Sequence, residues 1–223
     1  MATKQNFYPH FSVENNKKPD MIYAFPVLGF VLKLIMVIPV AIELFFLALA
    51  LGIVTFINLF YILFTGEYWD TTYNLFLGVL RLKMKMVLFL YGLTDKYPGF
   101  ELNTNGLFKL EIEKPKHPNK WFAVPLFGFL ARVVLLIPYL VFASVLGKGS
   151  CLSVVISWFA VTFKKKYAES LYEFVHDSLR VSTGASVYLM GLRDDYPSFE
   201  MSMDHKTKKI LLIIAGSILL FVN

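Results

Sequence analysis

The sequence has few charged residues and a single cysteine, and both shortages limit what the protein can be. Of its 223 residues, 17% are charged and 57% are hydrophobic, whereas an average soluble domain has about 25% charged residues. So little polar surface cannot cover a soluble globule, and the composition therefore indicates a membrane protein. With Cys151 as its one cysteine, the chain cannot form an intramolecular disulfide or a cysteine-based metal cluster.

Signals of several other protein classes are also missing. The first twenty residues are polar and mixed in charge, unlike a cleavable signal peptide of the usual form. The sequence has no Gly-rich phosphate loop, nucleophile elbow or triad spacing, so we expect no enzymatic activity and no cofactor. The net charge is +6, but without a basic groove or a recognised module we expect no nucleic-acid partner. In a membrane chain, an excess of basic residues marks cytoplasmic loops and contact with anionic lipid.

The sequence repeats itself at a constant offset of 99 residues. The aligned pairs near the end of each copy are Gly92 and Gly191, Leu93 and Leu192, Asp95 and Asp194, Tyr97 and Tyr196, Pro98 and Pro197. The register holds without a gap over roughly seventy-five residues, through prolines, glycines and a Tyr-Pro pair, which indicates two tandem repeats.

Each repeat begins with a long apolar run that we expect to fold into a membrane hairpin. The run from 21 to 64 is about twice the roughly twenty residues needed to cross a bilayer. In the second repeat, residues 147–150 read Gly-Lys-Gly-Ser, a reverse-turn composition that aligns with residues 48–51. The predicted arms are 22–47 with 53–65, and 123–146 with 151–164. Each return arm covers only about 20 Å, so it extends further, tilts, or belongs to a re-entrant hairpin.

A third segment in each repeat, 67–93 and 166–192, has the periodicity of an amphipathic helix. Its polar stripe holds Asp70, Asn74, Arg81 and Lys85 in the first copy, and Glu169, Glu173, His176, Asp177 and Arg180 in the second. Charges at the middle of a helix are costly to place in lipid. We therefore expect both helices to lie in the plane of the membrane interface.

A Tyr-Pro phrase occurs three times, as YPHFS at 8–12, YPGFE at 97–101 and YPSFE at 196–200. Tyr-Pro disfavours helix, and alternating residues after it predict short strands, including a β-hairpin around the sequence NTNG. We interpret the phrase as a structural motif whose strands pair into a small cytoplasmic sheet. Its residues are Tyr8, Pro9, Phe11, Tyr97, Pro98, Phe100, Tyr196, Pro197 and Phe199.

The predicted fold is an all-α integral membrane protein with two tandem repeats, short cytoplasmic β-strands and a short C-terminal hydrophobic helix. Its segments are an N-terminal segment 1–20, repeats 21–102 and 121–201, a β-hairpin linker 103–120, and a terminal helix within 202–223. Basic residues gather at the hairpin bases, and only Lys148 marks the opposite turn. The positive-inside rule then predicts a multi-pass protein with a cytoplasmic N-terminus.

Four short stretches resemble a bacterial membrane family catalogued as domain of unknown function 4389. They are Leu135–Pro138, Trp158–Phe163, Leu179–Arg180 and Asp195–Phe199, together with their partners in the first repeat. The resemblance covers most of residues 25–201 as two tandem copies. It implies a bacterial membrane protein, here placed in the cytoplasmic (inner) membrane, and it implies no established reaction.

Two pairs of repeated basic residues are candidates for lipid binding. Lys33 and Arg132 lie two turns inside the first helix, where they either snorkel toward headgroups or contact lipid phosphate. Arg81 and Arg180 lie on the polar face of the third helix, where they either clamp lipid phosphate or mark a solvated face.

Two further groups carry charge in unusual places. Glu43 lies deep in a membrane helix, so it either handles protons or cations, pairs with Lys33 or another subunit, or sits near the turn in water. Glu169, Glu173 and His176 have the spacing of metal ligands in helical bundles. The first repeat has Asn74 and Leu77 at the last two of these positions, so we expect no metal site.

Together these features predict a non-catalytic membrane scaffold or accessory subunit of a larger assembly. The expected partners are membrane lipids and either other membrane subunits or a second copy of the chain. The alternative is a lipid-binding or transport component that uses the duplicated basic positions, and a membrane enzyme is the third possibility.

Overall fold

The computed structural model describes residues 10–13, 20–25, 27–104, 106–115, 118–164 and 167–221. The described chain is mostly helical, as the sequence predicts. Its elements in order are β1 (His10–Val13), α1 (Met21–Ala24), α2 (Leu28–Thr65), α3 (Asp70–Leu90), β2 (Phe108–Glu111), the 3-10 helix η1 (Lys120–Ala123), α4 (Phe127–Lys164), α5 (Glu169–Leu189) and α6 (Lys206–Phe221).

The expected membrane hairpins are wrong, because α2 and α4 are each one continuous helix of 38 residues. Leu and Ala are strong helix formers, so the run LALAL near residue 48 favours a continuous helix over a turn. In α4 the small residues serve a close helix crossing. A Cβ on Gly149 would lie 2.8 Å from the Leu212 carbonyl oxygen of α6, and one on Gly216 of α6 would clash with the Val145 carbonyl.

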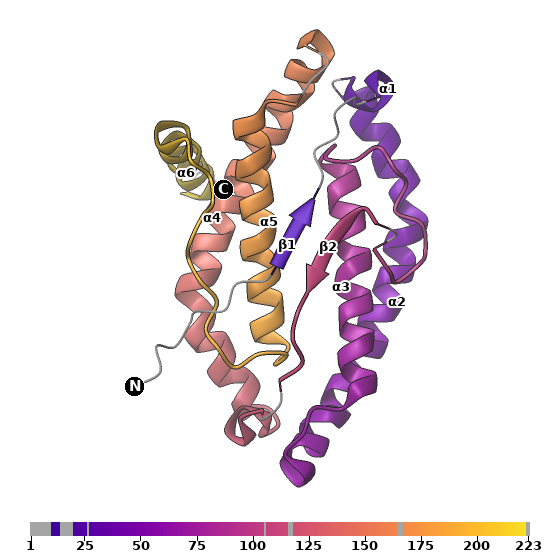
Figure 1. The fold of residues 1–223 in the computed structure, drawn as a ribbon, viewed down its shortest axis with the longest axis vertical. Coiled ribbons are helices and arrows are strands. Elements are labelled where there is room, and N and C mark those ends of the chain that lie inside the picture. Colours follow the sequence, from indigo (N-terminus) through magenta and orange to yellow (C-terminus); the bar gives the residue numbers. More distant parts are fainter. Residues whose placement is uncertain are drawn as a thin grey trace.

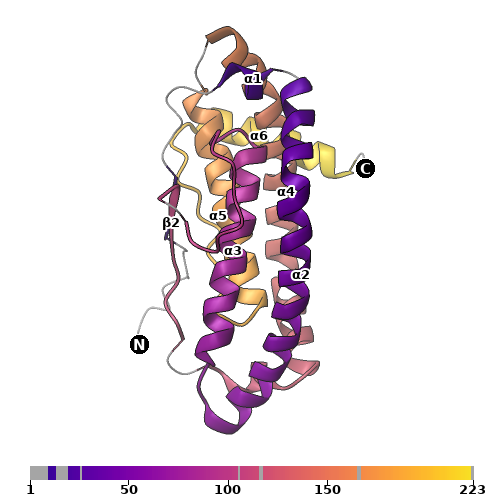
Figure 2. The same cartoon turned by 90° about the vertical axis from the view of Figure 1, so that its right-hand side faces the viewer.

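The elements stack in three layers, which Figures 1 and 2 show from the front and from the side. The first layer is the β-ribbon, formed by β1 and β2. The second layer consists of α3 and α5, which run antiparallel, and the third consists of α2 and α4. Within the repeats α2 packs on α3 and α4 packs on α5, while α6 crosses α4.

The α3 and α5 helices therefore form the middle layer of the molecule, and much of the face that we expected in water is buried, while their position at the membrane interface stays a prediction. Leu88 of α3 and Phe174 of α5 are fully buried, and so are the charged Lys85 and Asp177. The β-ribbon lies over the middle of α3 and α5 (Figure 1). The stripe residues Lys85, Asp177 and Arg180 are buried, whereas Asp70, Asn74 and Glu169 are exposed as expected.

The predicted small sheet is confirmed for β1 and β2, which pair antiparallel with Phe11 opposite Leu110 and His10 opposite Glu111. The buried Phe108 and Leu110 alternate with the exposed Lys109, as the strand pattern predicts. In the part of the chain that the structure describes, no strand directly precedes NTNG to form a local hairpin with β2, and residues 199–204 form no strand. In the first repeat, Leu102 instead packs on Gly78 of α3. A Cβ added to Gly78 would lie only 3.0 Å from the Cβ of Leu102.

A pseudo-twofold axis relates the two repeats. Thr183 Oγ1 lies 3.7 Å from Met84 Sδ, and these two residues are equivalent at the offset of 99. Equivalent positions can touch only near the axis that exchanges the copies. The exchange is reciprocal, since α1 packs on α4 and η1 packs on α2. Because the axis runs along the view direction of Figure 1, both long helices lie on the same face of the molecule.

Tyr73→Phe is expected to destabilise the protein by about 1 kcal/mol, the net value of a typical hydrogen bond. The Tyr73 hydroxyl donates to the Ile112 carbonyl oxygen and so holds the chain after β2 on α3. Thermal unfolding in detergent measures the loss. The matched control is Tyr61→Phe on the partly exposed outer side of α2, for which a change within about 0.5 kcal/mol is expected. Equal losses in both variants would contradict a specific role for the Tyr73 hydroxyl.

Candidate functional site

Arg132 is buried inside the second repeat at the point where α5 ends. Its Nη1 donates to the carbonyl oxygens of Tyr188 (2.9 Å) and Arg193 (3.1 Å), and its Nη2 pairs with Asp194. The guanidinium carbon also lies 4.5 Å from the ring centroid of Phe122. The end of a helix carries partial negative charge on its free carbonyls, so Arg132 neutralises both this end and the carboxylate.

The same carboxylate fixes the entrance to α4. Asp194 Oδ2 accepts a 2.6 Å hydrogen bond from the backbone N–H of Asn119, and Asn119 Oδ1 accepts a 3.0 Å bond from the N–H of Trp121. The Asn119 side chain thereby caps η1. We call Asn119, Arg132 and Asp194 the second lock, because they join the start of the long helix to the end of α5.

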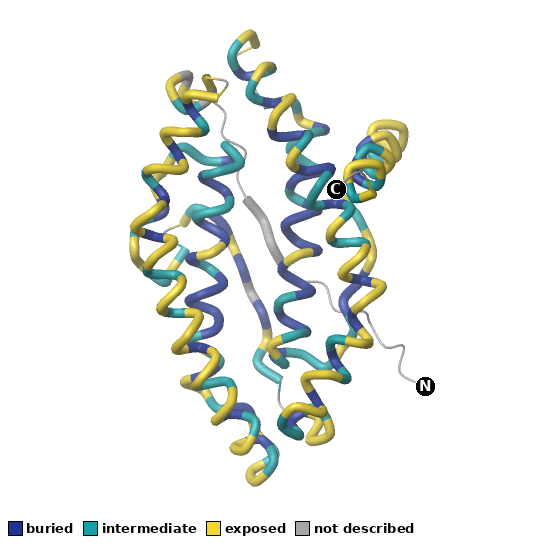
Figure 3. The backbone as a smooth tube through the Cα atoms, turned by 180° about the vertical axis from the view of Figure 1, so that it is seen from behind, coloured by how far each residue is buried: buried dark blue, intermediate teal, exposed yellow. Residues whose placement is uncertain are grey.

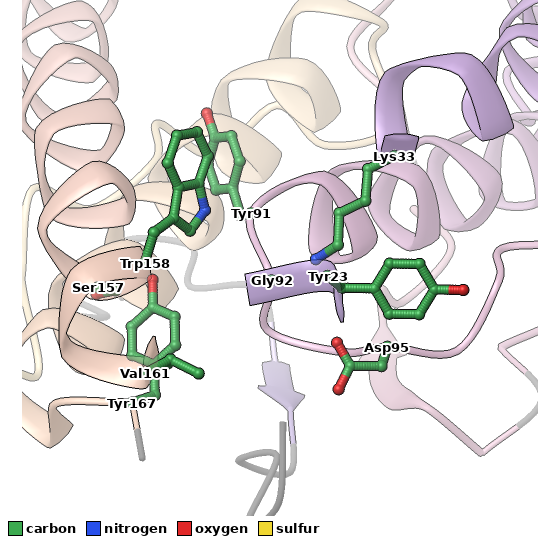
Figure 4. A pocket seen from close by; sticks show the side chains of 9 residues that line it. All are labelled: Tyr23, Lys33, Tyr91, Gly92, Asp95, Ser157, Trp158, Val161 and Tyr167. Carbon is green, nitrogen blue, oxygen red and sulfur yellow. The ribbon is translucent and has the colours of Figure 1, made fainter. Parts of the chain in front are cut away.

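The first repeat contains the same arrangement, which we call the first lock: Asp20, Lys33 and Asp95. Asp95 Oδ2 accepts from the N–H of Asp20 at 2.7 Å, and Asp20 Oδ1 accepts from the N–H of Ile22 at 3.0 Å. Lys33 is 2% exposed. Its ammonium lies near the ring of Tyr23, and the side chains of Lys33 and Asp95 line the same cavity (Figure 4). All three positions match the second lock at the offset of 99.

These positions correct the prediction that Lys33 and Arg132 reach lipid headgroups. Both side chains are buried in the protein, and the partners named above belong to their own repeat. Sequence reasoning missed the aspartates that receive them. The available signal was Asp95 and Asp194 themselves, since both stand at the same place before the Tyr-Pro phrase.

Arg180 also has a structural position. It is 6% exposed, its Nη2 lies 2.8 Å from Asp177 Oδ1, and it donates to the Glu200 carbonyl oxygen at 3.3 Å. Burial lowers the pKa of Arg180 to about 10. Because this pKa is still well above neutral pH, the side chain stays charged. The predicted lipid clamp is therefore wrong for Arg180. Arg81 is half-buried, and its lipid role stays a prediction.

The charged groups of α3 and α5 hold the chain that follows each Tyr-Pro phrase. Asp177 accepts from the Ser202 hydroxyl at 2.7 Å and from the Met203 N–H at 3.0 Å. In the first repeat the buried Lys85 donates to the carbonyl oxygen of Glu101, which is equivalent to Glu200 in the second. Burial lowers the pKa of Lys85. A different basic residue thus holds the same carbonyl in each copy.

Glu43 lies on the inner side of α2 and interacts electrostatically with Lys85 of α3. The carboxylate is half-buried, and its Oε2 has no hydrogen-bond partner among the described residues. Because α2 is continuous, Glu43 is not near a turn. The electrostatic partner that the structure gives it is Lys85, whereas the sequence suggested Lys33. Proton or cation handling by Glu43 stays a prediction.

The three metal candidates lie on the first three turns of α5. Glu169 is exposed, Glu173 is half-buried, and the ring of His176 stacks on Tyr172 at 6.4 Å between centroids. Within the part of the chain that the structure describes, no three His, Cys, Asp or Glu residues are grouped so that they could hold a metal ion.

The aromatic residues of the Tyr-Pro phrases pack on helices of their own repeat. Tyr196 and Phe199 contact the ring of Tyr139 on α4, at 6.0 and 5.0 Å between centroids. Tyr97 contacts Phe89 at 6.2 Å, whereas Phe100 is exposed. Pro98 and Pro197 are both buried. Phe11 lies in β1 opposite Leu110, and Tyr8 and Pro9 lie outside the described residues.

The outer side of α2 and α4 is largely exposed (Figure 3), and its exposed side chains are mostly apolar, so we call this surface the apolar face. Exposed side chains run from Leu28 to Phe64 on α2 and from Phe127 to Phe163 on α4. Both helices are described throughout, and their one exposed charged residue is Lys164, the last residue of α4. By length and composition, both helices are long and apolar enough to cross a membrane.

Two cavities occupy equivalent places in the two halves of the molecule. The open cavity, of about 430 Å³, lies between α2 and the start of α4 and has Asn58, Tyr68 and Arg132 in its lining. The counterpart lies between α4 and the start of α2, with Ser157, Tyr167 and Lys33 at the same positions (Figure 4). It encloses only about 10 Å³. A separate cavity of about 350 Å³ lies between α3, α4 and α5 beside Lys83 and Ser182.

Comparison with protein families gives a match over residues 28–101 and again over residues 128–200. No curated protein and no solved structure matches the chain. The two matched ranges cover the long helix, the following helix and the Tyr-Pro phrase of each repeat. The chain therefore belongs to the family described as Domain of unknown function (DUF4389) and carries that domain in two tandem copies.

Proposed function

We propose that the protein is a non-catalytic membrane scaffold of the bacterial cytoplasmic membrane, with both repeats lying flat on one leaflet. The apolar face enters the lipid, and the β-ribbon side faces water. The observation that carries this proposal is the separation of the two sides, with a surface on α2 and α4 whose one exposed charge is the terminal Lys164 and with exposed charged residues on the opposite, β-ribbon side.

The length of the apolar face supports the flat arrangement. A helix of 38 residues is about 57 Å long, nearly twice the roughly 30 Å of the hydrocarbon core. The exposed apolar side chains continue to both ends, since Leu28 is 67% and Phe64 is 84% exposed. An upright helix would leave about half of this surface in water, whereas a helix in the membrane plane buries it along its whole length.

The position of the β-ribbon supports the same arrangement. Its two described strands pair with each other, and Lys109 on β2 is exposed. The β-ribbon lies near the middle of α3 and α5 (Figure 1). In an upright bundle it would lie at mid-depth in the lipid, where an exposed charge such as that of Lys109 is costly.

The direction of α6 fits the same placement. This helix crosses α4, and its C-terminal end extends past the layer of α2 and α4 (Figure 2). Lys206, Lys208 and Lys209 stand at its start, on the side of the water-facing layers. Its 16 residues reach about 24 Å, so the apolar end enters the leaflet while the lysines stay at the headgroups. Basic residues at this boundary favour the cytoplasmic side.

A scaffold role is supported by how the charged groups are used. Arg132, Asp194, Asp177 and Arg180 hold the protein's own chain in place. The water-facing layer, with exposed Lys109 and Glu113 on the β-ribbon side, is then the surface offered to other membrane subunits. Native purification in mild detergent with mass spectrometry tests this role. Partners at constant stoichiometry support it, and a lone species argues against it.

Depth measurements on the outer side of α2 test the flat placement. In a Cys151→Ser background, single cysteines at Val31, Ile42 and Phe60 would each carry a nitroxide spin label in vesicles. All three positions are exposed on the apolar face. Because a helix in the membrane plane stays at one depth, similar accessibility to oxygen and to a water-soluble nickel reagent is expected at all three.

The control is a label at Lys109, an exposed position on the β-ribbon, which the nickel reagent should reach freely. A maximum depth at Ile42, with Val31 and Phe60 close to opposite headgroup regions, would instead show a crossing helix. That profile would overturn the flat placement.

A further inference from the structure

We propose that the open cavity between α2 and α4 binds a lipid acyl chain. The proposal rests on the membrane placement argued above, since it needs the apolar face to be in contact with lipid. The cavity volume of about 430 Å³ falls within the roughly 300–1,000 Å³ of small-molecule pockets. Its walls come from the second half of α2, from η1 and the start of α4, and from the end of α5.

The mouth of the cavity opens on the apolar face. Phe56 of α2 is 56% exposed, and Leu126 and Phe129 at the start of α4 are 76% and 49% exposed. All three line the cavity. A chain from the surrounding lipid can therefore enter without crossing water, so its hydrocarbon passes from one apolar environment to another.

The inner end of the cavity offers little to a charged ligand. Among the described residues of the lining, Arg132 is the one that carries a charge, and its guanidinium is bound to Asp194 and to two carbonyl oxygens. Asn58 Oδ1 accepts from the Trp69 N–H at 2.9 Å, and the Tyr68 hydroxyl donates to the Met190 carbonyl at 3.5 Å. Because these polar groups already have partners, the cavity suits a hydrocarbon chain whose headgroup stays outside.

The counterpart in the other half shows what closes such a cavity. The framework is the same, with Ile62, Tyr68 and Gly191 replaced by Val161, Tyr167 and Gly92. Leu59, however, is replaced by Trp158. The indole of Trp158 occupies this region (Figure 4) and packs on Phe30 at 5.1 Å between ring centroids. Tyr91 likewise takes the place of Met190. Because of these larger side chains, the counterpart cavity has a volume of about 10 Å³, whereas the open cavity has about 430 Å³.

Photo-crosslinking in vesicles tests the proposal with the full chain. One set of vesicles contains a phosphatidylcholine with a diazirine near the end of one acyl chain, and a second contains a diazirine fatty acid. Mass spectrometry of the peptides is expected to place crosslinks at residues 52–62 and 126–129. Labelling by the phosphatidylcholine identifies a bilayer lipid as the source, and labelling by the fatty acid alone identifies a free fatty acid.

Two variants exchange the states of the cavities. Leu59→Trp should lower labelling in the open cavity roughly tenfold, because a filled space cannot admit a chain. Trp158→Leu should add labelling at residues 151–161 in the other half. The control is Leu49→Trp, an exposed position on the apolar face outside the lining, which should leave the labelling pattern unchanged.

Vesicle flotation separates this proposal from the membrane placement. If Leu59→Trp floats with vesicles and loses the crosslinks, the acyl-chain cavity is supported. If it floats and keeps them, or if wild-type labelling is spread evenly along the apolar face, the cavity proposal is overturned while the placement stands. If Leu59→Trp does not fold, an absence of new crosslinks in a folded Trp158→Leu variant overturns the proposal. A wild-type chain that does not float overturns both.

Discussion

Arg132→Met is expected to lower the free energy of unfolding by about 3 kcal/mol, because removing one member of a buried ion pair leaves its partner uncompensated. The Asp194 carboxylate and the carbonyl oxygens of Tyr188 and Arg193 would lose their donor. The value stands at the low end of the usual range because the Asp194 side chain keeps 25% of its exposure. Chemical unfolding in detergent measures the change.

A double-mutant cycle with Asp194→Asn isolates the pair from other effects. If the lock acts as described, the double variant loses clearly less than the sum of the two single losses. Lys33→Met in the first lock should lose less than Arg132→Met, since an ammonium lacks the planar fork that serves several acceptors. Lys148→Met, a half-buried position on α4, is the control with little expected change. A similar loss from Lys148→Met would remove the special role of the lock.

Gly216→Leu is expected to separate α6 from α4 and to lower the free energy of unfolding by about 3 kcal/mol, the upper end for inserting atoms into a packed contact. A Cβ at this position already clashes with the Val145 carbonyl oxygen, and the nearest atoms belong to the α4 backbone, which cannot move aside. Unfolding measurements give the loss. Faster proteolysis between residues 198 and 205 should accompany it, since α6 no longer holds that chain in place.

Gly147→Ala is the matched control, because a Cβ there meets nothing within 4 Å. Within a continuous helix, this change should raise stability by up to about 1 kcal/mol. The same substitution in a turn would be harmful if that turn needed a positive φ. A loss of stability from Gly147→Ala as large as that from Gly216→Leu would therefore contradict the continuous α4 helix and support a turn at this position.

Much of the chain's organisation could be predicted from its sequence, because the duplication at an offset of 99 keeps its register through special residues. The third helix of each repeat and the pairing of the short strands followed from periodicity. The hairpin was predicted wrongly because small residues serve both turns and close helix crossings. Gly149 meets α6, a segment more than fifty residues later whose position the local sequence does not contain.

The candidate site was harder to predict for a related reason. Whether Arg132 faces lipid or protein depends on where the end of α5 lies, and periodicity gives only the side of the helix. The exposed surface of α2 and the buried surface of α5 are both rich in apolar residues, so composition does not distinguish lipid-facing from protein-facing sides. The difference between Leu59 and Trp158 could not be interpreted from the sequence, because only the structure shows that the two residues line equivalent cavities.

The contact between Met84 and Thr183 places the two copies of this domain as two subunits of a symmetric dimer are placed. Each half of the chain already meets the other through matching positions, as two identical subunits do across a symmetry axis. Because both copies belong to one polypeptide, their sequences can differ. One repeat can therefore contribute Leu59 to an open cavity while the other places the indole of Trp158 at the equivalent position.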